Sequence, residues 1–207
     1  MTGGGLTRRG FLGAAAAAVA VGVGTACGGG GGGDASSETT LETRPPLVGD
    51  AAVADLHARL ENLAIDTYGA LLTTASAGKL GPVPALVGAV LDAAKTQHTE
   101  HLAVWNGVMR AAGKPEVNTP DPGLKPTLDS MLAQVTDVEG AARLALLLEE
   151  ILADTYLKSI PTLLDKEAVR SAALILATDQ QHQVLLRLVL GDDPLPEPIQ
   201  IPDKAAS

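Results

Sequence analysis

The chain has 207 residues, a formal net charge of −9 and 46% hydrophobic residues. This is enough for one domain with an appendage and a buried core. Aromatic residues make up only 2% of the chain, so Ala, Leu and Val must fill the core, which favours helices over a β-sandwich. The acidic charge makes the chain a poor binder of nucleic acid, because phosphates would repel it.

The N-terminus has the features of an export signal. Thr7 to Leu12 reads TRRGFL and precedes a run rich in Ala and Val that ends at Val23. This order resembles a twin-arginine signal peptide, and the apolar run is too short to span a membrane. We therefore expect residues 1–26 to direct the protein across the cytoplasmic membrane.

Cys27 is the only cysteine, so no disulfide is expected. The sequence Gly24 to Cys27 reads GTAC and resembles a bacterial lipobox, although Gly24 stands where Leu is usual. Residues 27–50 begin with a glycine run and have too few apolar residues to fold, which is typical of a flexible tether. We expect lipidation of Cys27 to anchor the protein on the outer face of the membrane.

A helical bundle is expected at residues 51–191, where apolar residues recur at helical spacing within several segments. Asp50, Asp137 and Asp165 are expected to cap helices, and Gly113 and Gly191 to end them. A long connection at residues 114–126 and a short helix at 127–134 should separate two helical hairpins. Residues 192–207 contain four prolines and read as a tail. Four long helices are expected, at residues 51–75, 84–112, 137–159 and 166–190.

A repeated motif links the two hairpins. Leu60 to Tyr68 reads LENLAIDTY, and Leu148 to Tyr156 reads LEEILADTY. Five of the nine positions are identical, which suggests two copies of one helical unit. The helix after each copy carries a pair of residues three apart, which share one helical face. These pairs are His98 with His101, and Asp179 with His182.

Ionisable groups buried at mid-helix are costly unless they are paired or bind a metal. Six such residues are predicted to converge, and a cation would explain them. They are Glu61, His98, His101, Glu149, Asp179 and His182.

This pattern resembles the ferritin-like superfamily, in which two helices each give a Glu and two each give a Glu-x-x-His pair. The resemblance implies an all-α four-helix bundle with one long crossover between helices two and three, which then lie parallel. It assigns Glu61 and Glu149 as the single glutamates, and His101 and His182 as the histidines. His98 and Asp179 stand where the family has Glu, and ligand and non-ligand roles stay equally open for both.

The resemblance implies bound iron, which the family uses to oxidise ferrous ion or another small reductant. The two departures leave open a dinuclear iron centre, a mononuclear or mixed site for Zn, Mn, Fe or Cu, or loss of metal binding. A non-catalytic envelope lipoprotein that binds a partner is the alternative function. The expected partners are the membrane, through Cys27, and a metal ion; a homodimer is left open.

Several neighbours of the motif have simpler expected roles. Tyr68 and Tyr156 are expected in the core, with hydroxyls bonded to carboxylates. Trp105 should be core packing. His57 could be an extra ligand or a partner of one, but we favour a partly exposed histidine near a helix end. The residues expected to face water are Asp66, Glu100 and Glu150.

Overall fold

The computed structural model describes residues 47–206, so the predicted signal peptide and Cys27 lie outside the described residues. No strand is present between residues 47 and 206. The helices are α1 (Asp50–Ser76), α2 (Ala85–Ala111), α3 (Lys125–Leu132), α4 (Val138–Ser159), the 3₁₀ helix η1 (Ile160–Thr162) and α5 (Lys166–Leu190). The predicted all-α fold is confirmed, and the four long helices begin and end within one residue of the predicted positions.

The helix ends follow from local chemistry in the second hairpin. The Asp137 carboxylate accepts a hydrogen bond from the Gly140 amide at 2.7 Å, which caps α4. Asp165 caps α5 by accepting from the amides of Glu167 and Ala168. Gly191 ends α5 with a φ of 73°, a conformation that glycine adopts without a steric penalty.

The predicted cap at Asp50 is wrong. The residue before α1 is Gly49, with a φ of 59°, and no side chain caps this end. Asp50 is instead the first helical residue, and its carboxylate accepts from the amides of Leu164 and Asp165 at 2.8 and 2.7 Å. Asp50 thereby ties the start of α1 to the turn between α4 and α5, a contact that local sequence does not encode.

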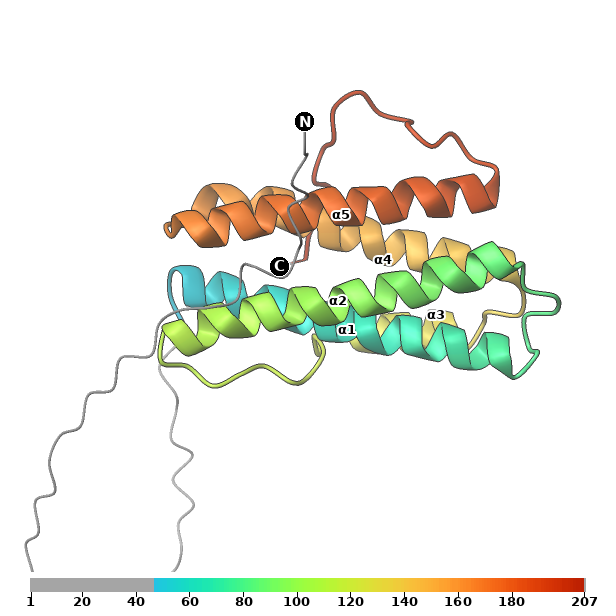
Figure 1. Ribbon diagram of the computed structural model, residues 1–207, viewed down its shortest axis with the longest axis horizontal. Helices are drawn as coiled ribbons and strands as arrows, with labels where there is room; N and C mark the ends of the chain where they lie inside the picture. The colour runs from blue at the N-terminus through green and yellow to red at the C-terminus, as the bar shows by residue number, and fades with distance from the viewer. Residues whose placement is uncertain (1–46, 207) are drawn as a thin grey trace, which may run out of the picture. The chain divides into compact units, whose positions relative to one another are not determined.

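Figure 1 shows two helical hairpins, α1–α2 and α4–α5, joined by one long connection that contains α3. Because this connection returns along the bundle, α2 and α4 run in the same direction, as predicted. None of the helices between residues 47 and 206 combines the length and the apolar character needed to cross a membrane.

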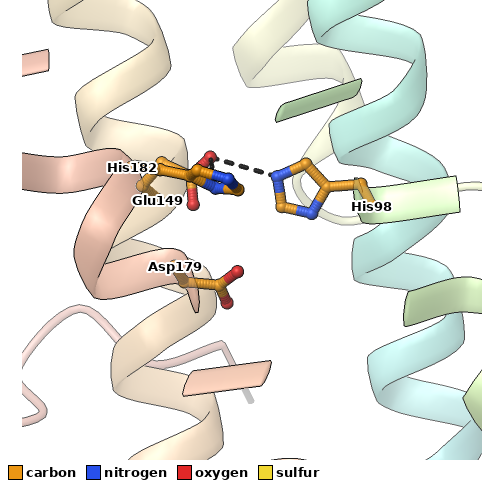
Figure 2. Close-up of side chains that lie close together, drawn as sticks. All are labelled: His98, Glu149, Asp179 and His182. Atoms are coloured by element: carbon orange, nitrogen blue, oxygen red, sulfur yellow. Dashed lines mark hydrogen bonds and ion pairs between the residues drawn. The ribbon is translucent and has the colours of Figure 1, made fainter. Parts of the chain in front are cut away.

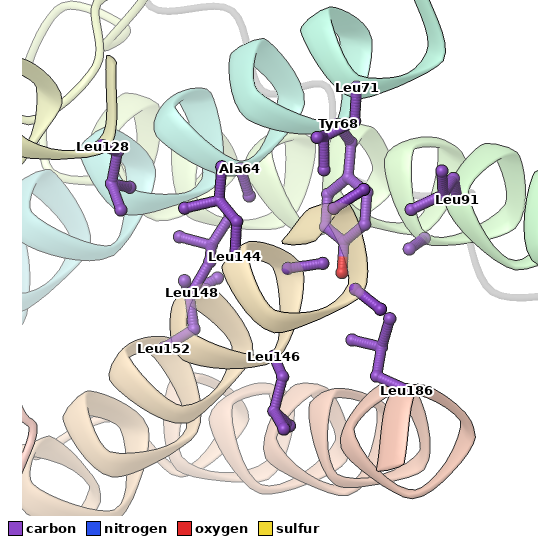
Figure 3. Packing of buried hydrophobic residues seen from close by; sticks show 14 of the residues in the cluster. Ala64, Tyr68, Leu71, Leu91, Leu128, Leu144, Leu146, Leu148, Leu152 and Leu186 are labelled. Carbon is purple, nitrogen blue, oxygen red and sulfur yellow. The ribbon is translucent and has the colours of Figure 1, made fainter. Parts of the chain in front are cut away.

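Two hydrophobic clusters fill the bundle. The larger contains Tyr68, Leu91, Leu148 and Leu186, one from each long helix (Figure 3). The other is built around Trp105 and Tyr156. Each fully buried leucine contributes roughly 1.5–3 kcal/mol to folding. Each long helix contributes to both clusters. On α2 and α5, the residues His98, His101, Asp179 and His182 lie between the parts of the helix that belong to each cluster.

Candidate metal centre

The structure brings all six predicted residues into the core of the bundle. Four are fully buried, and His101 and His182 are 8% and 4% exposed. Helical spacing explains the convergence, because residues three apart on α2 and on α5 face the same side. The two histidines are thus the members of the cluster that approach solvent. His101 lies on α2 and His182 lies on α5. The fully buried members are Glu61, His98, Glu149 and Asp179.

His98 lies between the two glutamates. Its Nδ1 is 2.8 Å from Glu61 Oε2, and its Nε2 is 3.0 Å from Glu149 Oε1. Burial lowers the pKa of His98, but the charges and hydrogen bonds of Glu149 and Glu61 raise it well above the usual value of 6.5. His98 is therefore an imidazolium that donates to both carboxylates, and its charge occupies the middle of the cluster.

The two glutamates stay ionised in the core. Burial raises the pKa of Glu61, but the neighbouring His101 and His98 have the larger combined effect. They lower the pKa from its usual 4.5 to about 2. Burial likewise raises the pKa of Glu149, but the charge and hydrogen bond of His98 oppose burial, and the resulting pKa is about 2. Two anionic carboxylates are thus held on opposite sides of the His98 ring, and both are fully buried.

The tyrosines of the repeat bond across to the other copy. Tyr156 O–H donates to Glu61 Oε1 at 2.5 Å, and Tyr68 O–H donates to Glu149 Oε1. Burial and the adjacent carboxylates raise the pKa of both tyrosines well above 10, so both remain donors. The predicted role of Tyr68 and Tyr156 is confirmed, and each fixes the glutamate that the other repeat supplies.

Several buried polar atoms in the cluster have no hydrogen-bond partner. They include both oxygens of Asp179, Oε2 of Glu149, and Nδ1 of His101 and His182. Such atoms are costly in a core, and a metal ion would satisfy them. Burial, followed by the charges of Glu149 and Glu61, raises the pKa of Asp179 well above its usual 3.8, so this carboxyl is neutral in the metal-free protein.

The donor atoms form two overlapping sets that could each hold a metal ion. One contains His98, Glu149, Asp179 and His182, and Figure 2 shows Asp179 pointing into the space between His98 and the other two. The other contains Glu61, His98 and His101. In both sets the ligand atoms lie within 4.8 Å of one another. Mixed imidazole and carboxylate donors suit Fe, Mn and Zn.

The family model described as "Ferritin-like domain" matches residues 49–192, which is well over half of the chain. The chain belongs to the ferritin-like family. No curated protein and no solved structure matches it. Domains of this family often bind iron, and the ferritin-like domain here has buried groups that could hold a metal ion.

The surroundings of the ferritin-like site correct one prediction. His57 is not partly exposed but fully buried. Its ring stacks on Tyr156 at 4.0 Å, and its Nε2 lies 2.6 Å from Ser159 Oγ. Burial lowers the pKa of His57 to about 4, although the charge of Glu61 opposes this. His57 is absent from both donor sets, so it packs beside the site as a neutral ring.

Trp105 is buried as predicted, and it also has a polar contact. Its Nε1–H donates to the Tyr156 hydroxyl at 2.6 Å, and this hydroxyl in turn donates to Glu61. Asp66 and Glu100 are exposed, as predicted. Glu150, expected to face water, is only partly exposed: its side chain is 16% exposed and pairs with Arg187 and Lys204 at 2.6 Å each.

Two glutamines near the site were missed in the sequence. Gln97 Oε1 lies 2.5 Å from His182 Nε2, and Gln183 Nε2 donates to the main-chain oxygen of Glu149 at 3.1 Å. Gln97 precedes His101 by four residues, and Gln183 follows His182 directly. The spacing of Gln97 placed it on the face of His101, but no local pattern reveals a bond to another helix.

Proposed function

We propose that this chain is a metal-binding ferritin-like protein held outside the cytoplasmic membrane by a lipid on Cys27. The observation that carries the metal-binding proposal is the set of buried carboxylate and imidazole atoms that have no hydrogen-bond partner. A bundle that needed only stability would place apolar side chains there, because unpaired polar atoms in a core are unfavourable.

The six residues of the two donor sets would hold the ion or ions, and His98 belongs to both sets. They are Glu61, His98, His101, Glu149, Asp179 and His182. Iron bound there would supply the oxidation of ferrous ion or another small reductant by oxygen. The chain's own contribution is to hold the glutamates with Tyr68 and Tyr156 and to keep water away from them. Access is limited to the edge at which His101 and His182 are slightly exposed, so the substrate must be small.

A second function rests on the contacts of His98. The imidazolium bonds both glutamates and thus supplies a positive charge without any metal. This favours the alternative of a non-catalytic helical lipoprotein that kept the bundle and lost the ion. Replacing a cation with one imidazolium leaves the Asp179 oxygens unsatisfied, and for that reason we prefer metal binding.

The metal content of the purified full-length chain tests the proposal. After folding with Fe, Mn or Zn, we expect a stoichiometric amount of metal in the parent and none in the double variant Glu61→Gln, Glu149→Gln. Glu100→Gln is the matched control, because Glu100 is exposed on α2. Metal-free parent protein, or equal metal in all three proteins, would overturn metal binding at this site.

The anchoring proposal rests on the sequence around Cys27 and needs its own test. We expect the chain to fractionate with membranes in cells that export it, and the Cys27→Ser variant to be released. A closed storage shell does not suit a lipid on every subunit. Membrane association that survives Cys27→Ser would contradict the lipid anchor and leave metal binding untouched.

A further inference from the structure

The two ring nitrogens of His182 have different surroundings. Nε2 lies 2.5 Å from Oε1 of Gln97, a contact that joins α5 to α2. Nδ1 is buried and lies 3.2 Å from Glu149 Oε1, a close contact that lacks the geometry of a hydrogen bond. The side of the ring that faces Glu149 is therefore the side without a hydrogen bond.

The Gln97 contact determines which nitrogen carries the proton. An amide oxygen can only accept, so His182 Nε2 must donate, and a neutral ring then has a bare lone pair at Nδ1. Glu149 Oε1 has no need of a proton from Nδ1. Its two lone pairs already accept from Tyr68 O–H and His98 Nε2–H.

The equivalent position in the other hairpin lacks this bond. Gln97 precedes His101 by four residues, and Thr178 precedes His182 by four. Thr178 Oγ1 donates to the Leu174 carbonyl of its own helix at 3.2 Å and does not reach across. The side chain at position 97 is long enough to cross between the helices, and that at 178 is not.

We propose that Gln97 is a positioning residue for His182. Its amide oxygen holds His182 in the Nε2–H tautomer and leaves the Nδ1 lone pair for an ion held by the donor set of His98, Glu149, Asp179 and His182. The role of the Nδ1 lone pair as a metal ligand rests on the proposed metal-binding function, whereas the tautomer of His182 does not depend on it. Groups that bond the second nitrogen of a histidine ligand commonly change metal affinity by about 10–100-fold.

The tautomer can be measured in the metal-free full-length chain by ¹⁵N NMR of the histidine rings. We expect the His182 signals of a ring protonated at Nε2 and bare at Nδ1 in the parent. Gln97→Met, which keeps the length but removes the acceptor, should lose this pattern, and Gln97→Glu should restore it. A parent ring protonated at Nδ1 would overturn the proposal.

Titration with Co²⁺, followed by absorption spectroscopy, tests the consequence for binding. Gln97→Met should weaken Co²⁺ binding about 10–100-fold, and Gln97→Glu should retain it. The matched control Thr178→Val should leave affinity unchanged. Equal affinity in the parent and Gln97→Met would overturn the positioning role. A parent that binds no Co²⁺ would overturn the proposed function instead, while the NMR result still decides the tautomer.

Discussion

The two hairpins share a scaffold but not a charge pattern. Glu61 and Glu149 occupy matching positions, yet the residue three before the second histidine of the site is His98 in one hairpin and Asp179 in the other. His98 is hydrogen-bonded on both sides, whereas neither oxygen of Asp179 has a hydrogen-bond partner. The repeat thus fixes the positions of the side chains. The exchanged pair, His98 and Asp179, decides where the cluster still needs a cation.

The surfaces of the hairpins are covered by different segments. In the first, Asn62 and Asn106 hold the main chain of Val117, which belongs to the connection between α2 and α4. In the second, Asp154 accepts from Gln200 Nε2 and the Lys204 amide of the C-terminal segment. The connection between α2 and α4 therefore covers the first hairpin, and the C-terminal segment covers the second (Figure 1).

The exchanged pair gives the largest predicted difference. His98→Leu would leave two ionised glutamates buried without their shared donor, and we expect a loss of about 3–5 kcal/mol in the free energy of unfolding. Asp179→Leu removes a neutral, unpartnered carboxyl, so it should be neutral or stabilising. Denaturant unfolding of the full-length chain in a chelator measures both. Equal costs would show that the two positions are equivalent after all.

His57, which has Ala145 at the matching position of the second hairpin, predicts an acid-sensitive step. Its folded pKa is lowered from 6.5 to about 4, so below pH 6.5 the unfolded chain binds a proton that the folded chain does not. Stability from His57 is complete above pH 6.5 and falls by roughly 3 kcal/mol as the pH approaches 4.

The raised pKa of Asp179 acts in the opposite direction over the same range, so the informative quantity is a difference between proteins. The free energy of unfolding of the parent and of His57→Gln should be measured from pH 7 to pH 4. We expect it to fall more steeply with decreasing pH in the parent. Parallel pH profiles would contradict a neutral buried His57.

Metal binding should release protons from the exchanged pair. His98 and Asp179 both have raised pKa values in the metal-free chain, so an ion that engages them must displace about two protons. Affinity for Zn²⁺ should therefore increase about tenfold per pH unit for each proton displaced. Calorimetry in buffers of different ionisation enthalpy counts these protons, and binding without proton release would show that the pair is not engaged.

Loss of the contacts that hold the C-terminal segment on the second hairpin gives the smallest predicted change in stability. Asp154→Ala removes two hydrogen bonds to the C-terminal segment, and we expect a loss of about 1 kcal/mol and faster proteolysis of that segment. The matched control is Asp66→Ala, at the exposed equivalent position on α1. Comparable proteolysis of the two variants would mean that Asp154 does not hold the segment.

The sequence predicted most of the fold because the relevant signals are local. Apolar spacing located the four long helices, and Asp137, Asp165 and Gly191 marked ends that their own hydrogen bonds and φ values explain. The repeat also placed the six polar residues on inward faces, since helical geometry alone aligns residues three apart.

What the sequence did not predict depends on contacts between distant segments. His57 is buried because Tyr156 and Ser159 of α4 pack over it, and Glu150 is covered because Lys204 returns from the chain end. The crossed tyrosine bonds and the Gln97 contact likewise join different helices. No spacing within one helix contains that information.

Anomalous X-ray diffraction from crystals of the chain grown with Fe, Mn or Zn is the most direct test of a cation in the core. The account predicts an anomalous peak enclosed by Glu61, His101, Glu149, Asp179 and His182. A peak only at surface carboxylates, or an empty core with His98 still bonded to both glutamates, would contradict it.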